Sequence, residues 1–164
     1  MSTTRATLTV CMGLPGSGKT TWCRTQPGVV VSADAIRTRK ANGRAIFGKM
    51  RREAGRALLD GVDVFVDACS LRWRDREPWL TFAREIGART RLVIIDTDPA
   101  ECRRRNRARR HPAGRMPIYE SRMRDALGRV SSEGWGDVKL TCSERSTQAP
   151  SGAQNLGTSE PTGV

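Results

Sequence analysis

The sequence has few aromatic residues, a single histidine and no long apolar segment. Aromatic residues make up 5% of the 164 residues, and apolar residues make up 37%. No run of about 18 uncharged apolar residues occurs, which excludes a membrane-spanning helix. The first residues show no basic region followed by an apolar segment, so we expect no secretory signal. These absences predict a soluble protein of the cytoplasm, either its own cell's or a host's.

The cysteines form no recognisable pattern. There are five of them, scattered along the chain and without a Cys-x-x-Cys pair. An odd number at such spacing argues against both a disulfide framework and a zinc site. Cys11 and Cys69 fall on or beside apolar runs, so we interpret them as small core residues.

Acidic residues are scarce in comparison with basic ones. Lysine and arginine number 29 against 17 for aspartate and glutamate, which gives a formal net charge of +12. Such a balance suggests an anionic partner, because the positive field raises the rate of encounter with one. A general preference for arginine in the composition is the alternative explanation.

Short valine-rich runs alternate with helical segments along most of the chain. The runs cover 6–12, 27–34, 62–68 and 90–96, with a weaker one at 138–142. Helices are expected over 19–24, 35–42, 49–60, 74–86, 100–110 and 118–130. In the fourth of these, Trp79, Phe82, Ala83 and Ile86 share one face, which predicts a core contact. The alternation predicts an α/β fold with a parallel sheet of about five strands and helices on both faces.

The composition changes at residue 143. Ser, Thr, Gly, Pro, Gln and Asn dominate 143–164, which carries one arginine and two glutamates. We therefore predict one folded domain over 1–142 and a disordered tail over 143–164. The excess positive charge belongs to the folded part.

The run GLPGSGKT, 13–20, fits the phosphate-binding pattern G-x-x-x-x-G-K-[ST] at each defined position. A β-rich run precedes it and a helix follows, as the motif requires. Glycines let backbone N–H groups converge on phosphate oxygens at the start of that helix. The lysine is expected to contact the β- and γ-phosphates, and the Thr20 hydroxyl to bind Mg²⁺. The sequence therefore predicts a P-loop for ATP and Mg²⁺, with these binding residues: Gly13, Pro15, Gly16, Ser17, Gly18, Lys19, Thr20 and Thr21.

The P-loop alone does not define a reaction, but other residues favour a kinase. The chain lacks the Asn-Lys-x-Asp motif of GTPases and is too short for a large motor ATPase. Asp34 and Arg37, three residues apart, would share a helix face after the second strand. A carboxylate there can accept the proton of an attacking hydroxyl while the arginine holds a phosphate of the acceptor. A helix cap with an ion pair is the structural alternative.

An arginine-rich segment follows the fourth strand. Between Glu101 and Arg129 there are ten arginines and three acidic residues. Arg105 and Arg109 lie four apart on one helix face, within the run 101–115 that we interpret as a lid. Arginines in such a lid stabilise charge on a transferring phosphoryl group. A solvated basic helix would also explain many of these residues.

The motifs GLPGSGKTTW, SADAIR, VFVDACSLR, WLTFAREIGA, IIDTDPAECRRRNRARR and MPI occur in the order seen in phage polynucleotide kinases. Over about 6–130 the chain resembles the 5′-kinase domain of those enzymes, and their wider group of small P-loop kinases with zeta-toxin-like members. The resemblance implies that Asp34 is the general base for the 5′-hydroxyl and that Arg37 grips the acceptor's 3′-side phosphate. It also implies that Arg109 contacts the donor phosphates. Family members often read Asp-Ala-Thr-Asn after the third strand, whereas here Asp67-Ala68 is followed by Cys69-Ser70.

The hypothesis from sequence is a Mg²⁺-dependent kinase that moves the γ-phosphate of ATP to a hydroxyl, most plausibly the 5′-OH of DNA or RNA. Its catalytic residues would be Lys19, Asp34, Arg37, Arg105 and Arg109, with Thr20 and Asp67 at the metal. For Asp67 a structural hydrogen bond is the alternative, and Trp73 either stacks on an acceptor base or packs on its own domain. Asp96 and Asp98 are interpreted as strand-end and capping residues. Rival hypotheses are a kinase for a modified base, nucleoside, sugar or other small metabolite, a nucleotide-dependent nucleic-acid binder without phosphoryl transfer, and a basic protein with a vestigial loop.

Overall fold

The structure, a computed structural model, describes residues 5–36, 43–109 and 115–142. Its strands are β1 (Thr7–Met12), β2 (Val29–Ser32), β3 (Val64–Asp67), β4 (Arg89–Ile95) and β5 (Asp137–Thr141). Its helices are α1 (Lys19–Arg24), α2 (Ala33–Ile36), α3 (Gly43–Leu59), α4 (Trp73–Glu85), α5 (Pro99–Ala108) and α6 (Met116–Leu127). A short 3-10 helix, Val130–Ser132, precedes β5. In the described part of the chain no helix is both long and apolar enough to cross a lipid bilayer.

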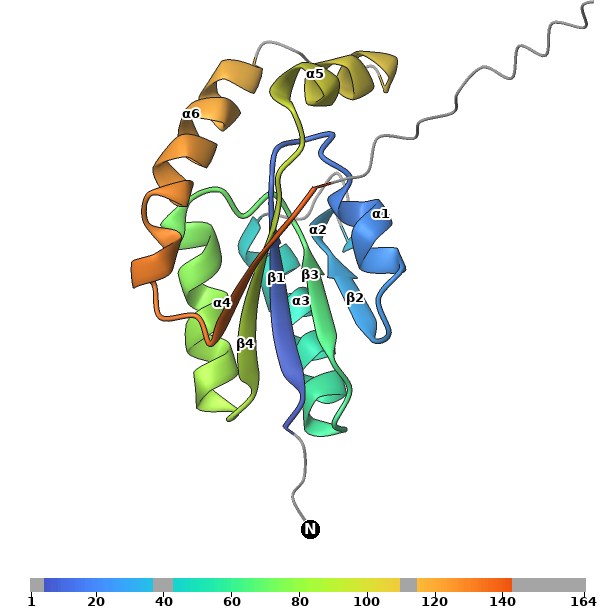
Figure 1. Ribbon diagram of the computed structural model, residues 1–164. Helices are drawn as coiled ribbons and strands as arrows, with labels where there is room; N and C mark the ends of the chain where they lie inside the picture. The colour runs from blue at the N-terminus through green and yellow to red at the C-terminus, as the bar shows by residue number, and fades with distance from the viewer. Residues whose placement is uncertain (1–4, 37–42, 110–114, 143–164) are drawn as a thin grey trace, which may run out of the picture.

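The five strands form one parallel sheet in the order β2-β3-β1-β4-β5 (Figure 1). This confirms the predicted α/β fold. The chain moves from central β1 outward to β2, returns to β3 beside β1, and then crosses to β4 on the other side. The direction of winding therefore reverses around β1. In open parallel sheets, ligands bind beyond the carboxyl ends of the strands at such a reversal.

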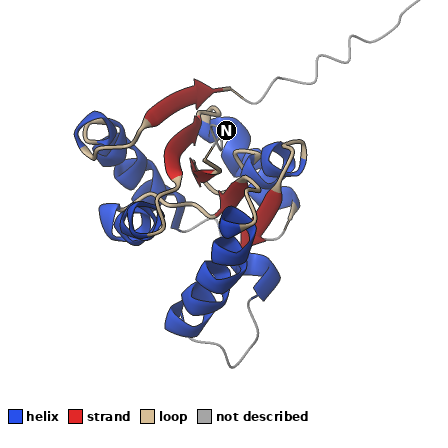
Figure 2. Cartoon of the chain, turned by 90° about the horizontal axis from the view of Figure 1, so that it is seen from below, coloured by secondary structure: helices blue, strands red, loops and turns tan. Residues whose placement is uncertain are grey.

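Both faces of the sheet are covered by helices, as Figure 2 shows from below. Alternate residues of β1 face opposite sides: Leu8, Val10 and Met12 join the larger core beneath α3, α4 and α6. On the other face Cys11 packs with Cys23 of α1 and with Phe65. Because successive side chains of a strand point to opposite faces, β1 contributes apolar side chains to the core on each face of the sheet. The larger core includes Trp79, Phe82 and Ala83 of α4, as their helical spacing predicts.

Most helix boundaries differ from the predicted ones, by one or two residues at several ends and by more in α3 and α6. Helix α3 begins at Gly43 rather than at residue 49, because Ile46 is buried and the Phe47 ring packs 5.0 Å from that of Trp79. Helix α5 ends at Ala108 rather than at residue 110, and α6 covers Met116–Leu127 rather than 118–130. Of the helix expected over 35–42, positions 35 and 36 belong to α2, and 37–42 lie outside the described residues. The predicted tail, 143–164, also lies outside them.

Both cysteines that were predicted to be core residues contact the hydrophobic core, to different depths. Cys11 is fully buried, and its sulfur lies 3.2 Å from that of Cys23. That contact and the burial raise the pKa of the Cys11 thiol far above its usual value, so it stays protonated. Cys69 is half-buried: it packs against the larger core, as predicted, and also lines a cavity. It follows β3 where the backbone leaves the sheet, which opens it to that cavity.

Candidate active site

Side-chain hydrogen bonds to consecutive backbone carbonyl groups hold the P-loop in place. Lys19 Nζ donates to the carbonyls of Gly13, at 3.0 Å, and Leu14, at 2.7 Å. The next three carbonyls accept hydrogen bonds from the segment that follows β4: Asn106 Nδ2 to Pro15 (2.8 Å), Arg105 Nη1 to Gly16 (3.3 Å) and Thr97 Oγ1 to Ser17 (2.8 Å). All five carbonyl oxygens from residue 13 to residue 17 are therefore engaged within the protein.

This arrangement determines where the backbone N–H groups of the loop point. In a trans peptide the carbonyl and the following N–H point in opposite directions. Holding the Pro15 and Ser17 carbonyls against α5 and Thr97 thus turns the N–H groups of Gly16 and Gly18 the other way. Gly16 and Gly18 have φ of +83° and +97°, in the left-handed region that favours glycine. Alternating backbone conformations of this kind form anion-binding concavities at the start of a helix.

Gly16 also allows α5 to approach the loop closely, which gives a stability prediction. A Cβ atom at Gly16 would lie 2.8 Å from the carbonyl oxygen of Cys102 and 3.1 Å from Asn106 Oδ1. We expect Gly16→Ala to lower the free energy of unfolding by about 2–4 kcal/mol, from backbone strain plus this clash. Gly61 has a similar φ of +79°, but a Cβ added there would meet no described atom within 4 Å, so Gly61→Ala should show the strain alone, about 1 kcal/mol. Denaturant unfolding of the two variants tests this, and equal losses would contradict the role of the close contact.

Lys19, Thr20 and Asp67 connect the P-loop with the end of β3. Lys19 is 7% exposed, and its ammonium lies inside the loop. Thr20 Oγ1 donates a hydrogen bond of 2.7 Å to Oδ2 of Asp67, which is 8% exposed. Hydroxyl and carboxylate oxygens are ligands that Mg²⁺ accepts, and Mg²⁺ usually takes only one or two protein ligands beside phosphates and water. The described residues hold no cluster of three or more His, Cys, Asp or Glu fit for a metal, so this pair suits that mode of binding.

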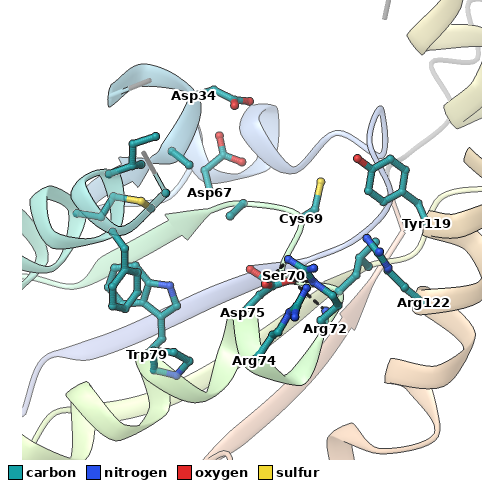
Figure 3. Close-up of a pocket in the computed structure, with 18 of the residues that line it drawn as sticks. Asp34, Asp67, Cys69, Ser70, Arg72, Arg74, Asp75, Trp79, Tyr119 and Arg122 are labelled. Atoms are coloured by element: carbon teal, nitrogen blue, oxygen red, sulfur yellow. Dashed lines mark hydrogen bonds and ion pairs between the residues drawn. The ribbon is translucent and has the colours of Figure 1, made fainter. Parts of the chain in front are cut away.

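A cavity of about 740 Å³ opens beside Asp67 at the carboxyl end of β3. Figure 3 shows the carboxylates of Asp34, on α2, and Asp67 on one side of it, with Tyr119 and Arg122 of α6 on the opposite side. Arg74 and the hydrogen-bonded pair Arg72–Asp75 come from the first turn of α4. The cavity therefore has an acidic end and a basic end.

The predicted lid arginines are placed as follows. Arg105 Nε donates to Glu101 at 2.7 Å, and its Nη1 reaches the P-loop at Gly16. The guanidinium groups of Arg104 and Arg105 hold the pKa of Glu101 at about 2, so Arg105 keeps its anionic partner at neutral pH. Arg109 is exposed at the C-cap of α5. Arg37 and residues 110–114 of the expected lid lie outside the described residues.

Sequence reasoning missed several residues that shape this site. Thr97 and Asn106 hold the P-loop, and Tyr119 and Arg122 line the cavity opposite Asp34. A single Asn among the arginines of 101–110 was the signal that the sequence offered, and the structure buries this side chain and bonds its amide to the Pro15 carbonyl. Nothing in the spacing of Tyr119 and Arg122 points to Asp34, which lies far away in the chain. Asp98 does cap α5 as predicted, since its side chain accepts a hydrogen bond from the N–H of Ala100.

A family described as an AAA domain, AAA_33, matches residues 8–131. The chain belongs to this family. The match includes the P-loop, Asp34, Asp67 and all of α6, and with the sheet order it establishes a P-loop kinase-like fold. None of the curated proteins matches the sequence significantly.

Solved structures of low sequence identity share this P-loop kinase-like fold. A chain of the Pnkp1/Rnl/Hen1 RNA repair complex superposes with a TM-score of 0.66 at 19% identity, over 75% of this chain and 45% of that one. The protein thus spans less than half of that chain's length. A gluconokinase from Sinorhizobium meliloti gives 0.54 at 16% identity, over 84% of this chain and 82% of that one. Chaetomium thermophilum Kti12 in complex with ADP-AlF3 gives 0.56 at 17% identity, over 82% and 88%.

Proposed function

We propose that this protein is an ATP-dependent kinase that transfers the γ-phosphoryl group to a hydroxyl, the 5′-OH of DNA or RNA. The observation that carries the proposal is the polarised cavity beside the P-loop, with Asp34 and Asp67 at one end and arginines of α4 and α6 at the other. A carboxylate at the acidic end can take the proton of an acceptor hydroxyl, and the arginines at the basic end can bind a phosphate of the same acceptor. A neutral sugar would leave those arginines without a ligand.

The residues of the P-loop would bind the donor. The N–H groups of Gly16 and Gly18 and the Lys19 ammonium would bind the phosphates of ATP. A Mg²⁺ ion held by Thr20 and Asp67 would neutralise charge on the β- and γ-phosphates. Arg105 and Arg109 would face the transferring group, and Thr21 stands in the first turn of α1 beside these ligands. Lys19 already lies within hydrogen-bond distance of the loop, so its charge is positioned by the fold.

Asp34 would act on the acceptor. The acceptor oxygen forms a bond to the γ-phosphorus while the bond from that phosphorus to the β–γ bridging oxygen breaks, and ADP leaves. The proton of the hydroxyl passes to the Asp34 carboxylate. Arg37 would hold the acceptor phosphate, as the family resemblance implies. Catalysis would rest on positioning and on stabilising charge rather than on a covalent enzyme intermediate.

The experiment is a panel of acceptors offered with ATP labelled at the γ-phosphate. DNA and RNA oligonucleotides with a 5′-OH, the same oligonucleotides with a 5′-phosphate, nucleosides, oligonucleotides with modified bases and gluconate are compared side by side. We expect label on the 5′-OH oligonucleotides only, and none with Lys19→Ala. Label on a nucleoside, a base or gluconate would assign a different acceptor. ATP binding with no label on any acceptor would instead support a nucleotide-dependent binding protein.

A further inference from the structure

We call the 740 Å³ cavity that contains Asp34 and Asp67 the acceptor cavity. A second cavity, of about 570 Å³, lies next to it, between the start of α4 and the C-terminal half of α6. The two cavities share Leu71, Arg72 and Arg122. The two cavities therefore adjoin each other, and their lining residues extend from Asp34 past Arg122 to Arg129. We name this second cavity the α4–α6 groove, and Arg76, Arg124, Asp125 and Ala126 also line it.

The α4–α6 groove carries positive charge that the described residues do not neutralise. Among them, no carboxylate forms an ion pair with Arg122, Arg124 or Arg129, and Asp125 is the only acid lining this cavity. The other two arginines are neutralised: Arg72 pairs with Asp75, and Arg76 pairs with Glu133. Three such guanidinium groups in one groove repel one another, and an anionic ligand relieves that repulsion.

Three of the four arginines of α5 show the contrasting case, the exception being the exposed Arg107. Arg103 pairs with Glu120, and Arg104 and Arg105 both pair with Glu101. A merely solvated basic surface would be expected to look like α5, with carboxylates interspersed. The groove instead presents its arginines toward a concave surface where the described chain places no such partners.

An aromatic side chain stands in the same groove. Trp73, the first residue of α4, lines the cavity and is 37% exposed, although large aromatic side chains are usually well buried. Exposed aromatic rings beside cationic side chains are the common means of holding the bases and phosphates of a single strand. Inside a duplex both faces of a base pair are covered by the neighbouring pairs, whereas each base of a single strand can expose a face to an indole, so the combination favours an unpaired strand.

We propose that the α4–α6 groove binds the single-stranded part of a nucleic acid whose 5′ end lies in the acceptor cavity. This rests on the proposed function, because the 5′-OH must reach Asp34 in the adjoining acceptor cavity. The acceptor would enter past Trp73 with its phosphates along Arg122, Arg124 and Arg129. The residues outside the acceptor cavity, Arg124 and Arg129, would then contribute to the binding of long acceptors and not of short ones.

The test uses the double variant Arg124→Ala/Arg129→Ala and two 5′-OH acceptors, a dinucleotide and an oligonucleotide of about 12 nucleotides, within the range of single-strand site sizes. We expect KM for the long acceptor to rise about tenfold at physiological salt, since two phosphate contacts are lost, with kcat unchanged. KM for the dinucleotide should not change. The matched control, Arg52→Ala/Arg56→Ala, removes two exposed arginines from a different surface, beside β2 and α3, and should alter neither KM.

Equal changes in KM for the two acceptors, or no change, would overturn the groove proposal while leaving the kinase proposal in place. A direct binding measurement tests the groove proposal even if the kinase proposal fails. Fluorescence anisotropy of a labelled 5′-phosphorylated oligonucleotide needs no phosphoryl transfer, and we expect the double arginine variant to reduce the salt slope of its binding by about 1.4. Trp73→Leu should weaken binding without altering that slope. Absence of binding by the wild-type protein would refute the groove proposal even if the protein phosphorylates a small acceptor.

Discussion

We expect Asp34→Asn to lower kcat for phosphoryl transfer by about a hundredfold or more while leaving the Kd for ATP unchanged. Asparagine keeps the shape of the side chain but its amide cannot take up the proton of the attacking hydroxyl. Asp34 lines the acceptor cavity from α2, and none of the five hydrogen-bonded P-loop carbonyls depends on it. The change should therefore affect the chemical step and spare the donor site.

The measurements are single-turnover transfer of labelled phosphate and calorimetric titration with ATP. Asp60→Asn is the control, because it neutralises an exposed carboxylate in the surface groove beside α3, away from the acceptor cavity. Wild-type kcat in the Asp34 variant would exclude it as the general base. A raised Kd for ATP at unchanged kcat would place Asp34 in nucleotide binding instead.

The second large effect concerns stability, and it arises from a buried ion pair. Arg76 is 1% exposed and forms a bidentate pair with Glu133, whose carboxylate also accepts a hydrogen bond from Trp135 Nε1. A third nitrogen, Nη1, donates to the carbonyl of Ser70 at 2.8 Å. The guanidinium thus joins α4, the loop after β3 and the turn before β5.

We expect Arg76→Met to lower the free energy of unfolding by about 3–5 kcal/mol, because the Glu133 carboxylate is left buried without a counter-ion. Chemical denaturation followed by circular dichroism gives the value. In the double variant Arg76→Met/Glu133→Leu no charge of this pair remains buried, so much of the loss should be recovered. Arg91→Met, which breaks the half-exposed pair of Arg91 with Asp137, should cost less than about 1 kcal/mol. Similar losses for Arg76→Met and Arg91→Met would contradict this explanation.

The strands and the P-loop could be predicted from local sequence because their signals are local. A strand buried on both faces, such as β3, needs consecutive apolar residues, and the runs predicted at 27–34 and 62–68 do contain the parallel strands β2 and β3. The glycines of the P-loop are required by backbone conformation within a few residues. Helix starts were less certain: Gly43 and Arg44 gave no start signal, and α3 is extended there by the packing of Phe47 on Trp79. That contact joins residues far apart in the chain.

The site was predictable only in part for the same reason. Lys19 and Thr20 were predicted from the P-loop motif and Asp67 from its place at a strand end, and the structure joins Thr20 and Asp67 by a hydrogen bond. The roles of Asn106, Tyr119 and Arg122 depend on how α5 and α6 pack against loops that lie much earlier in the chain. Spacing along one helix does not contain that information. Of the arginines of α5 only Arg105 was assigned a catalytic role from its spacing, and in the structure it forms an ion pair with Glu101, as Arg104 does, while Arg103 pairs with Glu120.

The fixation of the P-loop carbonyls has a thermodynamic consequence. A loop that must become ordered around its ligand loses backbone entropy on binding, at about 1–2 kcal/mol for each residue that is immobilised. Here the donors on Lys19, Thr97, Arg105 and Asn106 impose that order when the chain folds. Triphosphate association should therefore proceed with little conformational penalty, and its rate should be limited by diffusion and charge rather than by rearrangement of the loop.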